Sequence, residues 1–154
     1  MSRRMGSKIS IAIALALGVA VSGSAIASED ERWLAVLRRE TDFTNGIGKG
    51  SRPGPSSIQR AFTSLVRHRG TAAFLALTTS EESAPRLFGL CGLKQLDAPE
   101  YADVQRRLVE DREAVRGHVG CIRVNDTVGG VLAHEYGKSG RTVFDVICSE
   151  LIVK

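Results

Sequence analysis

The stretch from Ser83 to Leu96, SAPRLFGLCGLKQL, constrains most strongly what this chain can fold into. Apolar side chains fall on nearly every side of a helix drawn through it, and such a helix belongs in a protein interior. Gly89 and Gly92 lie one turn apart and therefore share a face of that helix. Each glycine costs about 1 kcal/mol of helix propensity relative to alanine, so the pair predicts close approach of another helix. Cys91, between them, is then a small buried residue rather than a nucleophile on a strand-to-helix turn.

Amphipathic helices are predicted around this central segment, because apolar residues recur there at spacings of three and four. The C-terminal part is less regular. Residues 118–124 suit a short extended stretch, and Asp126 or Thr127 suits the cap of a short helix over 127–137. Residues 142–153 have helical spacing, although their β-branched content leaves a strand possible. The predicted fold class is all-α, with about five to seven short helices and an aliphatic core. The earlier predicted helices span 29–41, 57–69, 71–80, 83–97 and 99–116.

A glycine- and proline-rich segment over 42–55, DFTNGIGKGSRPGP, predicts a flexible surface loop. Its GIGKGS portion lacks the G-x-x-x-x-G-K-[ST] spacing of a phosphate-binding loop, and no strand pattern precedes it. Functional loops share this composition. Lys49 and Arg52 are therefore candidates for binding an anionic group.

The N-terminal 27 residues have the three parts of a secretory signal peptide. Basic residues stand in MSRRMGSK, an apolar run follows over 9–21, and Ala25-Ile26-Ala27 fits the small-x-small cleavage rule. A membrane span needs about 20 apolar residues, which is longer than this run. We predict cleavage after Ala27, leaving residues 28–154 as a single exported domain, periplasmic or secreted, with no membrane segment.

The calculated isoelectric point of 9.3 partly reflects this leader. The leader holds three of the 21 basic residues and none of the 17 acidic ones, so 18 basic residues face 17 acidic ones afterwards. A nearly neutral domain without zinc-finger spacing or interleaved aromatics does not fit nucleic-acid binding.

Three cysteines follow the leader, and disulfides persist in the compartments that exported proteins reach. Cys91, Cys121 and Cys148 allow three single pairings, among which the sequence does not choose. The first expectation is Cys91 with Cys121. Closing that loop of about 30 residues stabilises by roughly 3–4 kcal/mol in the chain-entropy description. The alternative is that all three remain free thiols in the core.

Catalytic patterns are weak. A thiol nucleophile needs a histidine beside it in space, and His118 is near Cys121 in sequence. His134-Glu135 begins like H-E-x-x-H, but Lys138 stands where the second histidine ligand belongs. We predict no catalytic residue, no metal ligand and no cofactor.

The short helices over 56–116, with a Leu/Ala-rich buried one at their centre, resemble HEAT-like helical-repeat packing. The segments RLFGLCGLKQLD and PEYADVQRRL are also similar to secreted bacterial proteins that have no assigned activity. The resemblance implies a helical fold and no particular reaction.

These observations together favour an exported, non-enzymatic helical domain that binds an unidentified protein partner, such as an envelope accessory factor, an inhibitor or an immunity-type protein. One alternative is a small secreted thiol-dependent hydrolase that uses Cys91 or Cys121 with His118. Another is an apolar-ligand carrier with a cavity between its helices.

Overall fold

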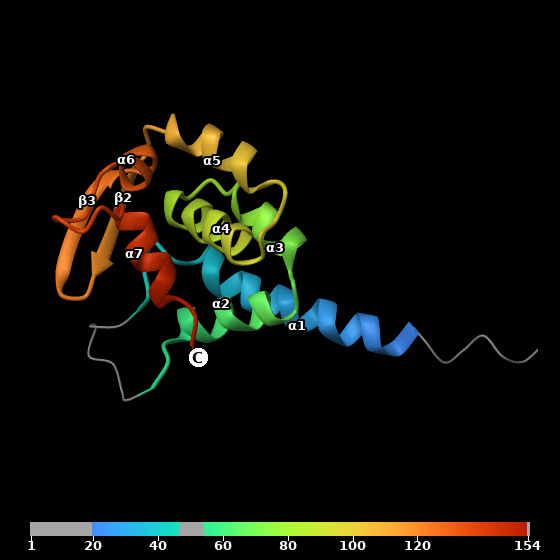
Figure 1. The fold of residues 1–154 in the computed structure, drawn as a ribbon. Coiled ribbons are helices and arrows are strands. Elements are labelled where there is room, and N and C mark those ends of the chain that lie inside the picture. The colour runs from blue at the N-terminus through green and yellow to red at the C-terminus, as the bar shows by residue number, and fades with distance from the viewer. Residues whose placement is uncertain (1–19, 47–53, 154) are drawn as a thin grey trace, which may run out of the picture.

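The computed structural model describes residues 20–46 and 54–153, with side chains described from residue 29 onward. Within these ranges the chain forms seven helices and three strands (Figure 1). None of these helices has the length and apolar character that crossing a membrane requires. In chain order the elements are α1 (Ala20–Arg38), β1 (Asp42–Thr44), α2 (Ser57–Arg67), α3 (Thr71–Leu77), α4 (Ser83–Gln95), α5 (Tyr101–Val109), β2 (Ala114–Val119), β3 (Ile122–Thr127), α6 (Val128–Ala133) and α7 (Val143–Glu150).

Helix α4 lies at the centre of the fold, as its sequence predicts. It contacts the six other helices and also β1 and β2, and every residue from Leu87 to Leu93 is buried. The predicted close approach at the two glycines is confirmed. A Cβ atom on Gly92 would overlap the ring of Phe74 in α3, and one on Gly89 would lie 2.6 Å from the Phe74 carbonyl oxygen. The absence of side chains at these positions allows α3 to pack this closely.

The all-α prediction is wrong, because a three-stranded sheet packs against the helices. The strand order is β1-β2-β3, with β1 parallel to β2 and β2 antiparallel to β3. In β2, Val115 and Val119 are buried while Ala114 and Arg116 are exposed. This alternation is the pattern of a half-buried strand. The helix predicted over 99–116 therefore ends earlier, at Val109, and the extended stretch predicted over 118–124 is part of a hairpin.

The predicted loop 42–55 begins with strand β1, which sequence analysis missed. Phe43 is fully buried, with its ring centre 5.1 Å from that of Phe88 and 6.0 Å from that of Phe144. Its register partner in β2 is Gly117. A Cβ atom at position 117 would lie 3.0 Å from the Phe43 carbonyl oxygen, so glycine allows the two strands to approach closely. Burial of one aromatic side chain thus helps to hold a three-residue strand in a polar, glycine-rich sequence.

Helix α1 starts earlier and ends earlier than the predicted helix over 29–41. It begins at Ala20, so the predicted cleavage point after Ala27 falls within it. Figure 1 shows the first part of α1 projecting away from the folded body, while its later part lies beside α2. Leu34 and Leu37 of that later part are buried. The remainder of the predicted leader, residues 1–19, lies outside the described residues.

Side-chain caps fix the starts of three helices. Ser56 accepts from the Gln59 backbone N–H, and the Gln59 side chain accepts from the Ser56 N–H, which closes a capping box. Thr142 and Asp145 form the same motif at the start of α7. The 142–153 segment is therefore mainly helical, and the strand alternative is not adopted. Thr127 caps α6 in turn.

The core contains more aromatic surface than predicted. All five phenylalanines of the sequence are among its fully buried side chains, together with leucines and isoleucine. Phe62 and Phe74 pack with ring centres 5.3 Å apart, and Phe43 bridges Phe88 and Phe144. The sparse aromatic residues are thus concentrated where they bury the most apolar area.

Candidate functional site

The disulfide predicted between Cys91 and Cys121 is not the one that forms. Cys91 of α4 is instead joined to Cys148 of α7, with Cα atoms 5.7 Å apart. Both residues are buried. The physical reason is that α7 packs along α4, whereas the hairpin carries Cys121 to the surface. The sequence did not distinguish these pairings, because either one joins α4 to a C-terminal segment.

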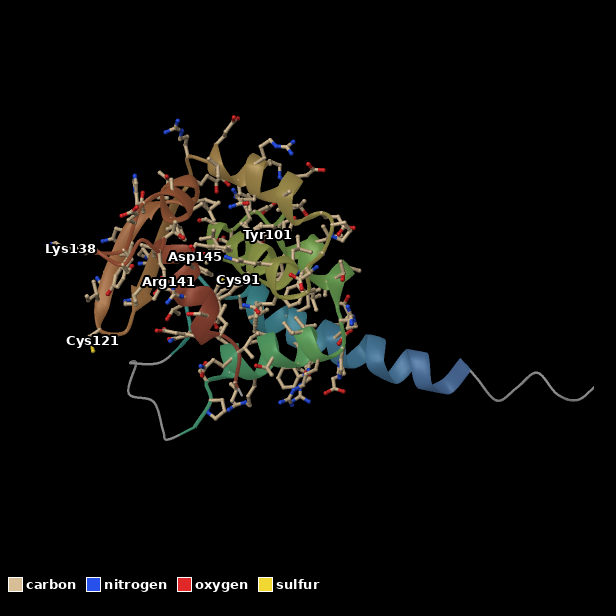
Figure 2. The ribbon with its side chains drawn as sticks, in the orientation of Figure 1. Cys91, Tyr101, Cys121, Lys138, Arg141 and Asp145 are labelled. Atoms are coloured by element: carbon tan, nitrogen blue, oxygen red, sulfur yellow. A yellow bond between two sulfur atoms is a disulfide. The ribbon has the colours of Figure 1, made fainter. Side chains whose placement is uncertain are left out.

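Cys121 is a free, exposed thiol in the turn between β2 and β3. Figure 2 shows its side chain at the tip of the hairpin, pointing away from the folded body. His118 lies in β2 with its Nδ1 atom 3.8 Å from the Asp42 carboxylate. The imidazole therefore faces β1, not the thiol. This arrangement lacks the orientation that a Cys–His nucleophile pair requires.

An ion-pair cluster joins β1 to β2 beside that histidine. The Asp42 carboxylate is mostly buried, and its Oδ1 lies 3.1 Å from Nε of Arg116. The register places Asp42 opposite Arg116 and Thr44 opposite His118. These charges stabilise the pairing of the short strand β1 with β2 electrostatically.

A second polar cluster anchors α7 to α4. Lys94 Nζ donates to Asp145 Oδ1 at 2.6 Å and lies over the Phe144 ring. Burial opposes ionisation of Asp145, but hydrogen bonds from Lys94 and Thr142 outweigh it and lower the pKa of that carboxyl. Burial raises the pKa of Tyr101, whose phenol is also close enough to feel the charges of Lys94 and Asp145. Tyr101 and Asp145 thus belong to a helix-anchoring contact.

A third cluster surrounds Arg86, at the start of α4. Its guanidinium donates to Asp111 Oδ2 at 2.5 Å and Glu113 Oε2 at 2.6 Å, and also to two backbone carbonyls. A hollow of about 360 Å³ adjoins it, and Arg107 on the wall of that hollow donates to the carbonyl and the hydroxyl of Thr78. Because both cations are already bound by protein groups, we interpret this cluster as a structural contact that joins the start of α4 to α5, to the segment after α3 and to the segment before β2.

His134, which begins the H-E pair of the sequence, contacts an acid rather than a metal cluster. Nδ1 of His134 is 2.7 Å from Asp126 Oδ2, and no group of three histidine, cysteine or acidic residues in the described ranges could hold a metal ion. Lys49 and Arg52, the predicted anion-binding pair, lie outside the described residues.

The outer side of β3, residues 122–127, is an open sheet edge that sequence analysis missed. In the order β1-β2-β3 no described strand pairs with it, and its backbone forms no hydrogen bond there with another described segment. Ile122 is 56% exposed, which is rare for a large apolar side chain in this structure, and Arg123 and Asn125 are exposed beside it. Figure 1 places the hairpin at the opposite end of the molecule from the start of α1. The sequence signal for this strand was the alternation of apolar and polar residues in HVGCIRVND.

Comparison with protein-family models, with curated proteins and with solved structures gives no match to this chain. The predicted resemblance to HEAT-like repeats and to secreted bacterial proteins therefore stays a prediction. Function has to be argued from the geometry alone.

Proposed function

We propose that this protein is an exported, non-enzymatic binding domain that pairs an extended segment of another protein with the open edge of β3. The observation that carries the proposal is that edge. Unpaired N–H and C=O groups along a strand are a template for a further strand, and several peptide-binding domains use such an edge. Exposed Ile122 adds an apolar contact at one end of the strand.

Polar side chains on the same strand fit this role. Arg123, Asn125 and Asp126 discourage indiscriminate edge-to-edge aggregation, as charged residues do on natural edge strands. They still leave the backbone accessible to a partner with matching side chains. Polar and charged residues along the edge therefore favour selective pairing with a partner strand over self-aggregation.

The two alternative functions have less support. Cys91 is held in a disulfide, Cys121 points away from the folded body, and His118 lies beside Asp42, which together disfavour a thiol-dependent hydrolase. A carrier needs a cavity among the helices, whereas the centre of this fold is filled by phenylalanines whose rings pack against one another. Both points favour a binding role for the surface over chemistry in the interior.

Export is supported by two independent features. One is the N-terminal sequence, with its basic, apolar and small-residue parts. The other is the buried disulfide between α4 and α7, a bond that persists in oxidising compartments. The intact mass of the protein recovered from its producing cell tests this. A chain that begins at Ser28 with one free thiol supports export, and a chain retaining residues 1–27 with three free thiols contradicts it.

The binding role is tested by photo-crosslinking in the native compartment. A photoreactive residue replaces Asn125 on the β3 edge, and in a matched control it replaces Arg106, an exposed residue of α5. We expect one defined adduct from the edge position and none from α5. The adduct disappears with Ile122→Asp, which changes an exposed side chain and leaves the core intact. Equal crosslinking from both positions, or none from the edge, contradicts the proposal.

A further inference from the structure

The open edge of β3 offers backbone groups at only two residues. The hairpin closes at Val119 and Ile122 around a two-residue turn, and the closing pair of such a hairpin exchanges both backbone hydrogen bonds. Every second residue of β3, counted from Ile122, therefore bonds to β2. The N–H and C=O groups of Arg123 and Asn125 point the other way, to the open side. A partner strand can form backbone hydrogen bonds with these two residues.

Both ends of this edge are closed to further pairing. At one end the strand begins directly after the turn at 120–121. At the other end, the Thr127 N–H already donates to Asp126 Oδ1 at 2.7 Å, and the Thr127 side chain caps α6. The edge that can accept a strand therefore runs from Arg123 to Asn125. It matches the three-residue length of β1, which lies at the opposite edge of the sheet.

The side chains of β3 divide between the two faces of the sheet. Residues that lie directly opposite one another in an antiparallel pair share a face. Ile122 and Val124 lie opposite Val119 and Gly117, which are buried on the packed face of β2. Val124 packs partly against the core, whereas Ile122 is 56% exposed. Apolar surface on the packed face is therefore left uncovered along this edge.

Strand β1 shows how this sheet holds a three-residue strand at its other edge. Its middle residue, Phe43, is fully buried against the phenylalanines of α4 and α7. Its outer residues, Asp42 and Thr44, are polar. Because side chains alternate along a strand, this pattern places the apolar side chain on the packed face and the polar ones on the other. The same rule applies at β3, where Ile122 and Val124 supply the uncovered apolar surface.

We propose that the segment bound at the β3 edge is a short antiparallel strand with the pattern polar–apolar–polar–apolar from its N-terminal to its C-terminal end. Its two apolar side chains pack beside Val124 and Ile122, in that order. Its two polar residues form backbone hydrogen bonds with Asn125 and Arg123. The antiparallel direction is favoured because antiparallel pairing is slightly more stable per residue than parallel pairing. This inference rests on the proposed function, since it specifies the partner of the same edge.

The test is an NMR titration of the purified, isotope-labelled protein with short end-blocked peptides. The probe is the hexapeptide GTVSVG, and GTSVVG has the same composition without the alternation. We expect GTVSVG to shift the amide signals of Arg123 and Asn125 with saturation. The amides of Ile122 and Val124, which face β2, should shift less. GTSVVG should bind at least about threefold more weakly, because only one of its valines can face the packed side.

N-methylated forms of the probe report on the backbone register. A methyl group on the serine nitrogen removes the N–H that donates to the Arg123 carbonyl. A methyl group on the nitrogen of the first valine replaces an N–H that points away from β3. We expect the first change to abolish binding and the second to leave most of it.

Two protein variants separate the edge from general apolar attraction. Ile122→Ser should weaken binding of GTVSVG by about three- to tenfold, because an apolar contact is lost. Val109→Ser in α5 is the matched control and should change nothing, since Val109 is the other exposed large apolar side chain of the described residues, at 45%. Equal binding of the two peptides, equal effects of the two methylations or of the two variants, or no shift at Arg123 and Asn125 overturns the inference. An edge that crosslinks in the native compartment but fails these tests contradicts the alternation and not the proposed function.

Discussion

The contact between α3 and α4 allows a quantitative prediction for Gly92→Ala. An alanine methyl group at this position would overlap the ring of Phe74, which is fully buried and itself packs against Phe62. The ring has no free volume to move into, because packing around it is close. The substitution therefore has two opposing effects. Alanine is a better helix former than glycine, but its methyl group overpacks the core.

Their magnitudes decide the sign. Replacing glycine by alanine inside a helix gains about 1 kcal/mol in propensity. Forcing extra atoms into a well-packed core typically costs about 1–3 kcal/mol, and more where neighbours are rigid. Because several ring atoms lie within the overlap, we expect the upper part of that range and a net loss of about 2 kcal/mol. For a domain of this size that lowers Tm by roughly 6–10 °C.

Chemical denaturation of the purified variants measures this directly. Gly92→Ala should lower the unfolding midpoint with an unchanged slope against denaturant. Combining it with Phe74→Leu, which removes the ring, should recover about 1 kcal/mol relative to the sum of the single changes. A Gly92→Ala variant more stable than the parent, or strictly additive effects in the double variant, would refute the close packing of α3 on α4.

Three further predictions concern the anchors of the fold. Replacing Cys91 and Cys148 together by alanine should cost about 4 kcal/mol by the chain-entropy description for a separation of 57 residues, and thermal unfolding unaffected by reductant would contradict the pairing. Arg86→Met leaves Asp111, only 13% exposed, without its cation and should cost about 2 kcal/mol or more in urea unfolding. Burial opposes ionisation of Asp145, but its hydrogen bonds outweigh burial and lower its pKa. The stability that ionised Asp145 contributes is fully present above its unfolded-state pKa, and it is lost as pH falls through its lower folded-state pKa. Asp145→Asn should therefore flatten the pH dependence of stability below about pH 4, and an unchanged profile would contradict it.

Where local pattern decides structure, the sequence was sufficient. The all-round apolar character of α4 and the close approach of another helix at its glycine pair follow from spacing, and the cap of α6 at Thr127 is one of the two candidates that the sequence offered. These features involve residues within a few turns of one another. The leader, with its three parts in order, is likewise a local pattern, and its cleavage after Ala27 stays a prediction.

The tertiary structure alone decided what depends on distant partners. Strand β1 exists because Phe43 reaches a pocket between α4 and α7, a contact that no local pattern encodes. Cys148 rather than Cys121 meets Cys91 because α7 packs along α4. The same long-range packing leaves β3 at the edge of the sheet. Sequence periodicity fixes which face of a segment is apolar, whereas the identity of the surface covering that face is settled only when the whole core closes.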